Sequence, residues 1–95
     1  MSDEIGAAHP ALAGHFPGRP IVPGALLLAR VAAAAGRSFG AVRGVPTAKF
    51  MAPLRPGERF EVELEATAAS VRFRVMRGKT VIASGTLQLA RIAAP

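Results

Sequence analysis

The sequence contains no cysteine, no tryptophan and no tyrosine, and its two histidines are His9 and His15. The lack of cysteine excludes disulfide bonds and thiolate metal sites, and two histidines alone argue against a zinc site. The shortage of aromatic side chains, together with the lack of any basic run, argues against a nucleic-acid-binding surface. We therefore expect no metal, no other cofactor and no nucleic-acid partner.

Long apolar runs and a basic N-terminal segment are also missing. The main apolar stretch, Ala25–Ala35, is interrupted by Arg30 and is far shorter than the roughly 20 residues that span a bilayer. Asp3 and Glu4 stand where a secretory signal would carry basic residues. These features predict a soluble, cytoplasmic protein without a membrane span.

What the chain does have is a large apolar share for its size. Its 95 residues predict a single domain over 1–95, yet 51% of them are hydrophobic and the mean hydropathy is +0.33. So small a globule cannot readily hide that much apolar surface, so we expect a homodimer or higher oligomer. The net charge of +6 either reflects an Arg-rich composition or attracts an acidic partner.

One helix is predicted to form the centre of the fold. Pro23 suits the first helical position, Ala25–Ala35 is rich in helix-forming residues, and Gly36 supplies a stop. Because this helix is apolar on nearly every face, something must wrap around it. Residues 1–22 read as irregular, tightly turned chain.

Strands follow the helix along the sequence. We expect one over roughly 45–52, a turn at 53–57, and then alternating strands that begin at Phe60 and Val71. Residues 80–92 form the last strand. One apolar helix against an antiparallel sheet that curls around it is an α+β arrangement.

The two alternating strands also predict their own register. If Thr67–Ser70 form a hairpin loop, apolar residues face each other on one side and opposite charges face each other on the other side. The expected pairs are Leu64 with Phe73, Val62 with Val75, Glu65 with Arg72, and Glu63 with Arg74. The Glu and Arg runs are therefore interpreted as a solvated sheet face rather than a catalytic cluster.

Three segments resemble a known family. HFPGRPIVPGALLL (residues 15–28), AKFMAPLRPGERFEVELEA (48–66) and ASGTLQLA (83–90) resemble the 3-hydroxyacyl-[acyl-carrier-protein] dehydratases of hotdog fold. The resemblance covers roughly residues 9–90. It implies a sheet wrapped around the helix, a dimer of hotdogs paired edge to edge, and acyl tunnels at the dimer interface. It also implies an acyl carrier protein, which bears a phosphopantetheine-linked acyl chain, as partner.

The resemblance assigns the site residues. His15 aligns with the catalytic histidine that acts on the α-proton of the thioester, and Gly24 with the glycine whose N–H binds the thioester oxygen. Both roles are physically reasonable, because histidine transfers protons near neutral pH and a helix N-terminus has unpaired N–H groups. The expected substrate-binding residues are Phe16, Pro17, Gly18, Pro23, Ala25 and Ala29.

The chain departs from this family at one position. The helix carboxylate that protonates the departing hydroxyl lies fourteen residues after the histidine, and here that position is Ala29. General acid catalysis contributes about 10²–10⁴ in rate. Neither neighbour replaces the acid, because Leu28 is apolar and Arg30 stays charged. Arg30 either extends to the interface or pairs with a carboxylate of a partner chain.

Three functions remain open from the sequence. The first is a dehydratase-like hydro-lyase of fatty-acid or polyketide-type synthesis, weak or dependent on a partner chain. The second is an impaired acyl-binding subunit that forms a heterodimer with an acid-bearing homologue. The third, weaker possibility is a hotdog thioesterase. His9 is interpreted as a loop residue.

Overall fold

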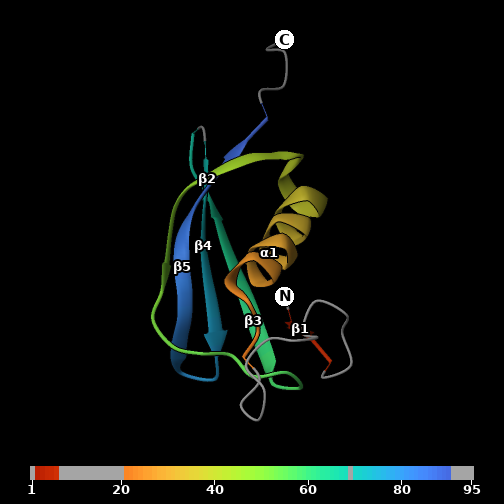
Figure 1. The fold of residues 1–95 in the computed structure, drawn as a ribbon. Helices are drawn as coiled ribbons and strands as arrows, with labels where there is room; N and C mark the ends of the chain where they lie inside the picture. Colours follow the sequence, from red (N-terminus) through yellow and green to blue (C-terminus); the bar gives the residue numbers. More distant parts are fainter. Residues whose placement is uncertain (1, 7–20, 69, 91–95) are drawn as a thin grey trace.

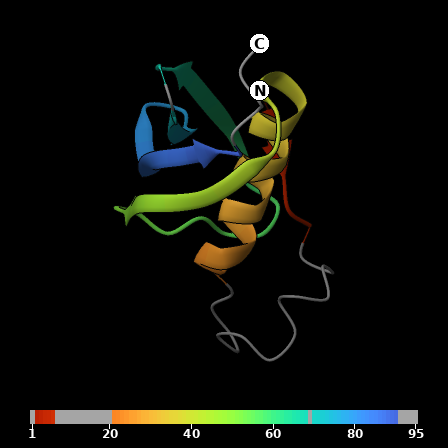
Figure 2. The same cartoon turned by 90° about the horizontal axis from the view of Figure 1, so that it is seen from above.

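The computed structural model describes residues 2–6, 21–68 and 70–90, which form one helix and five strands (Figure 1). In chain order these elements are β1 (Ser2–Glu4), α1 (Gly24–Phe39), β2 (Val42–Phe50), β3 (Arg59–Ala66), β4 (Ser70–Arg77) and β5 (Thr80–Leu89). The strands form a single antiparallel sheet in the order β1-β3-β4-β5-β2. The helix lies across one face of this sheet (Figures 1 and 2). The predicted α+β class is confirmed.

The helix is longer than the sequence suggested. It begins at Gly24 with Pro23 as the N-cap, and it continues to Phe39 through the predicted stop at Gly36. Gly40 ends it instead, with a φ of 103° and an N–H that donates to the Gly36 carbonyl at 3.3 Å. A helical glycine costs about 1 kcal/mol relative to alanine. The packing of Phe39 against the core offsets that cost.

The helix presents two different faces. Leu27, Val31, Ala34 and Ala35 are buried against the sheet, at the spacing of one helical face. Residues on another face are exposed, at positions 25, 29 and 33. Within the described residues, the sheet of this chain packs against the first of these faces, as the hotdog arrangement predicts, and what covers the rest of the helix stays a prediction.

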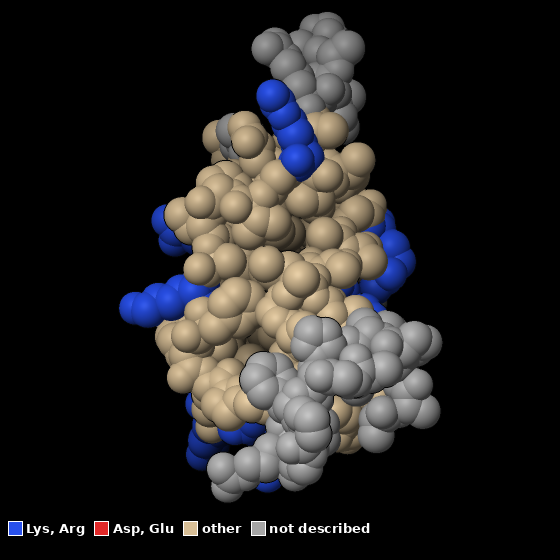
Figure 3. Space-filling view, viewed as in Figure 1, with Lys and Arg blue, Asp and Glu red and all other residues tan. Residues whose placement is uncertain are grey.

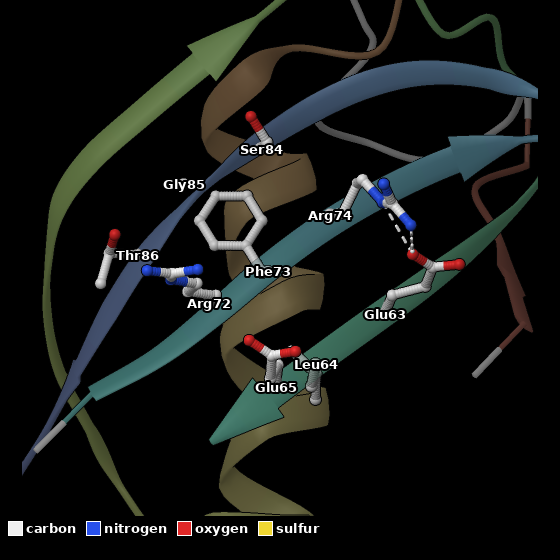
Figure 4. Close-up of a pocket in the computed structure, with 9 residues that line it drawn as sticks. All are labelled: Glu63, Leu64, Glu65, Arg72, Phe73, Arg74, Ser84, Gly85 and Thr86. Atoms are coloured by element: carbon white, nitrogen blue, oxygen red, sulfur yellow. Dashed lines mark hydrogen bonds and ion pairs between the residues drawn. The ribbon is translucent and has the colours of Figure 1, made fainter. Parts of the chain in front are cut away.

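The predicted register of β3 and β4 is confirmed in full. Leu64 lies opposite Phe73, Val62 opposite Val75, Glu65 opposite Arg72, and Glu63 opposite Arg74. Val62, Phe73 and Val75 are buried beneath α1. On the outer face, Arg74 Nε donates to Glu63 Oε1 at 2.7 Å (Figure 4). A shallow hollow of about 550 Å³ lies over these strands and is lined by both charge signs, as expected of a solvated face.

The two edges of the sheet correct the sequence-based outline. Ser2–Glu4 form a strand where irregular chain was expected, and Ile5, which follows it, is 1% exposed in the core. At the other edge, β2 begins at Val42 rather than 45, and its pairing with β5 is irregular between Val42 and Thr47. β5 ends at Leu89, although the Ala90 N–H still donates to the Ala41 carbonyl at 2.7 Å, and residues 91 and 92 of the predicted strand lie outside the described residues.

Candidate active site

An apolar groove opens beside the N-terminus of α1. Its volume is about 430 Å³. The lining residues come from the chain before the helix, the first helical turn, the end of β2 with the following loop, and β5: Ile21, Val22, Pro23, Gly24, Leu27, Phe50, Met51, Ala52, Pro53, Leu54 and Ile82. The groove therefore joins a helix terminus to apolar walls, which suits an acyl chain with a polar group at one end.

Gly24 lies in close contact with the ring of Phe50. A Cβ atom at position 24 would lie 2.9 Å from Cζ of Phe50, closer than side-chain atoms tolerate. The Phe50 ring thus packs directly on the Gly24 backbone, although it is 48% exposed on its other side. This contact brings the end of β2 to the first residue of the helix.

The Gly24 amide is a free hydrogen-bond donor as far as the structure describes the chain. The Pro23 carbonyl accepts the N–H groups of Leu26 and Leu27, each at 3.1 Å, but residues 2–6, 21–68 and 70–90 supply no acceptor for the Gly24 N–H. The first amides of a helix have no intrahelical partner, and the helix dipole favours negative charge beside them. The position can therefore stabilise an oxyanion.

The loop at Pro53 and Leu54 is hydrogen-bonded to the segment that leads into the helix. The Val22 N–H donates to the Leu54 carbonyl at 2.7 Å, two residues before Gly24. Arg77 Nη1 donates to the Pro53 carbonyl at 2.7 Å and to Glu58 Oε1 at 3.3 Å. The guanidinium at the end of β4 thereby fixes the loop that in turn fixes the helix N-terminus.

Position 29 is not among the residues that line the groove. Ala25 and Ala29 are exposed on the helix and do not line it, so their contact with substrate stays a prediction, whereas Pro23 and Gly24 do line it. α1 itself carries no acidic residue.

Arg30 takes a partner that neither sequence-based alternative named. Its Nη1 binds Asp3 of its own chain, at 2.9 Å to Oδ1 and 3.1 Å to Oδ2, and the two predicted alternatives at an interface stay predictions. The Asp3 carboxylate is thus held by a guanidinium of α1. The pairing was not foreseeable, since β1 itself was not predicted.

The histidine loop lies outside the described residues, and with it His9, His15, Phe16, Pro17 and Gly18. Within the described residues no group of three His, Asp or Glu side chains could hold a metal ion. Within that same part of the chain, no helix is long and apolar enough to cross a membrane.

Of the residues that line the groove, sequence reasoning named only Pro23 and Gly24, and it missed the rest, among them Phe50, Leu54 and Ile82. Phe50 was assigned to a strand without any link to Gly24, because the contact joins residues 26 positions apart. The signal that could have pointed to it is the glycine itself, which implies that something approaches its Cα closely.

Comparison with known proteins agrees with this geometry. The family model described as ApeI-like, ApeI dehydratase, matches residues 2–86. The chain belongs to this family. It has the hotdog fold: the ApeI-like chain superposes with a TM-score of 0.83 on a structure described as the dehydratase heterocomplex ApeI:P from Xenorhabdus doucetiae. That match has 21% identity and covers 95% of this chain and 84% of that one. An uncharacterized protein from Erwinia carotovora superposes with a TM-score of 0.75 at 24% identity, covering 96% and 81%.

Sequence relatives carry the name 3-hydroxyacyl-[acyl-carrier-protein] dehydratase FabZ. The protein from Aliarcobacter butzleri is 32% identical over 93 residues, covering 82% of this chain and 63% of the relative. The one from Cronobacter sakazakii is 34% identical over 105 residues, covering 92% and 69%. The ApeI-like chain thus spans a little under two thirds of the first of these relatives. The predicted membership of the FabZ-like hotdog dehydratases is confirmed.

Proposed function

We propose that the chain contributes the base and the oxyanion donor of a hydro-lyase site that converts a 3-hydroxyacyl thioester to the 2-enoyl thioester and water. The observation that carries the proposal is the Gly24 N–H, which lacks an acceptor among the described residues and lies at the end of an apolar groove. The substrate would be presented by an acyl carrier protein, as the names of the FabZ relatives indicate for those proteins.

The chemistry uses two groups of this chain. His15 removes the α-proton, and the electron pair moves onto the thioester oxygen, which the Gly24 N–H stabilises. Collapse of this enolate forms the C2–C3 double bond and breaks the C3–O bond. The leaving hydroxyl takes up a proton and departs as water. The groove walls, Phe50 among them, would exclude solvent from the enolate.

The third group, the acid that protonates the leaving hydroxyl, has no candidate on α1. Position 29 is alanine, and the oxygens of Asp3 are engaged by Arg30. The chain is then slow on its own, or it is completed by a homologue that supplies the carboxylate. The second arrangement is supported by the solved structure that this chain resembles, which is described as a dehydratase heterocomplex, ApeI:P.

A dehydration assay tests the proposal. Purified chain is incubated with a 3-hydroxyacyl thioester, and enoyl absorbance is followed for the wild type, His15→Ala and Ala29→Glu. Ala29→Glu is expected to raise the rate by about 10²-fold, the usual contribution of a general acid. Turnover that is no higher than that of His15→Ala, in both the wild type and Ala29→Glu, would overturn the proposal. Release of free thiol without enoyl product would instead identify a thioesterase.

A further inference from the structure

A tight turn, residues 55–58, precedes β3. Pro56 and Gly57 stand at its two central positions, and Gly57 has a φ of +85°, as the third residue of a type II turn requires. The Glu58 N–H donates to the Arg55 carbonyl at 3.2 Å, and Glu58 Oε1 accepts the Arg55 N–H at 2.7 Å. The carboxylate of Glu58 therefore closes the turn on which it lies.

This turn and the residue before it bind two parts of the chain that are far apart in sequence. The Gly57 N–H donates to the Ile5 carbonyl at 2.7 Å, and the Leu54 carbonyl accepts the Val22 N–H at 2.7 Å. Ile5 and Val22 are both buried in the apolar core. Because Ile5 precedes His15 in the sequence and Val22 follows it, the chain is held at the same turn on both sides of the histidine.

One cation of β4 ties the turn to the sheet. Arg77 Nη1 donates to Glu58 Oε1 at 3.3 Å and to the Pro53 carbonyl at 2.7 Å. The side chains of Arg77 and Glu58 are 33% and 34% exposed. Ion pairs with this degree of exposure contribute little to the free energy of unfolding. We therefore expect these contacts to matter more for the geometry of the turn than for the stability of the fold.

The groove itself offers no charge that could position a reacting group. Every described residue that lines it is uncharged. Figure 3 shows the face around α1 as largely uncharged, with Lys and Arg side chains at its rim. The turn continues one wall of the groove, because Pro53 and Leu54 line it and Arg55 follows them. Polar contacts in this turn can therefore set the position of that wall.

From these contacts we infer that Glu58 is a positioning residue of the hydro-lyase site. By closing the turn, it keeps the hydrogen bonds to Ile5 and Val22 in place, and these set where the chain that carries His15 meets the first turn of the helix at Gly24. The inference rests on the proposed function, because the two groups that it positions are the base and the oxyanion donor named there. A misplacement of about 1 Å can cost about 10²-fold in rate, so a loosened turn should cost about tenfold.

Substitutions at position 58 test this role in the Ala29→Glu background, where dehydration is expected to be fastest. Glu58→Ala should lower kcat about tenfold and change KM by less than about twofold, because the apolar walls that bind the acyl chain remain. Glu58→Gln keeps an oxygen that accepts the Arg55 N–H, so its kcat should stay within about threefold of the parent. The matched control is Glu63→Ala, which removes an exposed carboxylate paired with Arg74 and should leave kcat unchanged. An unchanged kcat in Glu58→Ala, or an equal loss in Glu63→Ala, would overturn the inference.

A proximity measurement tests the same role without turnover. The chain has no cysteine, so His15→Cys provides a single site for a nitroxide label, and broadening of the Gly24 amide NMR signal reports how close the label lies. Glu58→Ala should weaken this broadening, and Glu63→Ala should not. No broadening in any variant, or equal broadening with and without Glu58→Ala, would overturn the inference. Weakened broadening in Glu58→Ala, with no dehydration by any variant, would leave the positioning role standing and count only against the proposed function.

Discussion

The two edges of the sheet are built in opposite ways. At the β1 edge, polar side chains are paired: Asp3 binds Arg30, and Arg59 Nη1 donates to Ser2 Oγ at 3.1 Å. Phe60 and Ile5 beneath that edge are each 1% exposed. At the β2 edge, Phe50 and Met51 remain about half exposed, and both charged residues on the strand are cations. The first edge is therefore closed by contacts within the chain, whereas the second leaves apolar side chains exposed.

The largest expected effect is the change in the free energy of unfolding when one aromatic ring at each edge is truncated to alanine. Phe60→Ala should lower the free energy of unfolding by about 3–5 kcal/mol, because the ring is buried. Phe50→Ala should lower it by less than about 1 kcal/mol in the isolated chain, because half of the ring is exposed. Urea unfolding measures both values, and equal losses would contradict the comparison.

Substitution of Gly24 and of Gly36, both in α1, distinguishes an effect on the candidate site from an effect on the stability of the helix. Gly24→Ala should lower dehydration about tenfold or more, because the new Cβ displaces the Phe50 ring beside the oxyanion donor. Gly36→Ala is the control, because nothing lies within 4 Å of its Cβ position. It should leave the rate unchanged and stabilise the fold by about 0.5–1 kcal/mol. A Gly24→Ala enzyme with the wild-type rate would remove Gly24 from the site.

Removal of the guanidinium that braces the loop should give an intermediate effect. Arg77→Ala loses the hydrogen bonds to Pro53 and Glu58, which should lower the free energy of unfolding by about 1 kcal/mol. It should also speed hydrogen exchange of the Val22 amide, which bonds to the same loop. Arg74→Ala, on the same strand but paired outward with Glu63, should leave the Val22 amide unchanged. Equal Val22 exchange in the two variants would show that the loop needs no brace.

The smallest effect is expected at the pair that joins β1 to the helix. Asp3→Asn should lower the free energy of unfolding by about 0.5 kcal/mol, because both side chains are partly exposed. The loss should shrink at high salt, where screening weakens the wild-type pair. A loss that is independent of salt would mean that Asp3 acts through hydrogen bonding rather than charge.

Local patterns predicted the parts of the fold that local chemistry controls. Alternation and opposite charges determined the register of β3 on β4, and Pro23-Gly24 marked the start of the helix. The strand Ser2–Glu4 was not predicted, because three polar residues show no alternation of apolar and polar side chains. This strand forms through its pairing with β3. The helix passed Gly36 because Phe39 packs on the core, a tertiary contact that propensity does not report.

The site was predicted in the same uneven way. The family resemblance pointed to Gly24, and the structure explains that glycine through the Phe50 ring, which comes from a strand 26 residues later. The Arg30–Asp3 pair joins residues 27 positions apart and could not be read from either segment. Both contacts join residues that only the folded sheet brings together, so the local sequence around each residue could not predict them.

Complementation between two defective chains tests the shared site most directly. Wild type carries His15 but no helix carboxylate, and His15→Ala/Ala29→Glu carries the carboxylate but no base. If each site takes its base from one chain and its acid from the other, an equimolar mixture should dehydrate a 3-hydroxyacyl thioester about tenfold faster than the sum of the separate proteins. A mixture that is no faster than that sum, despite mixed dimers in the native mass spectrum, would contradict the account.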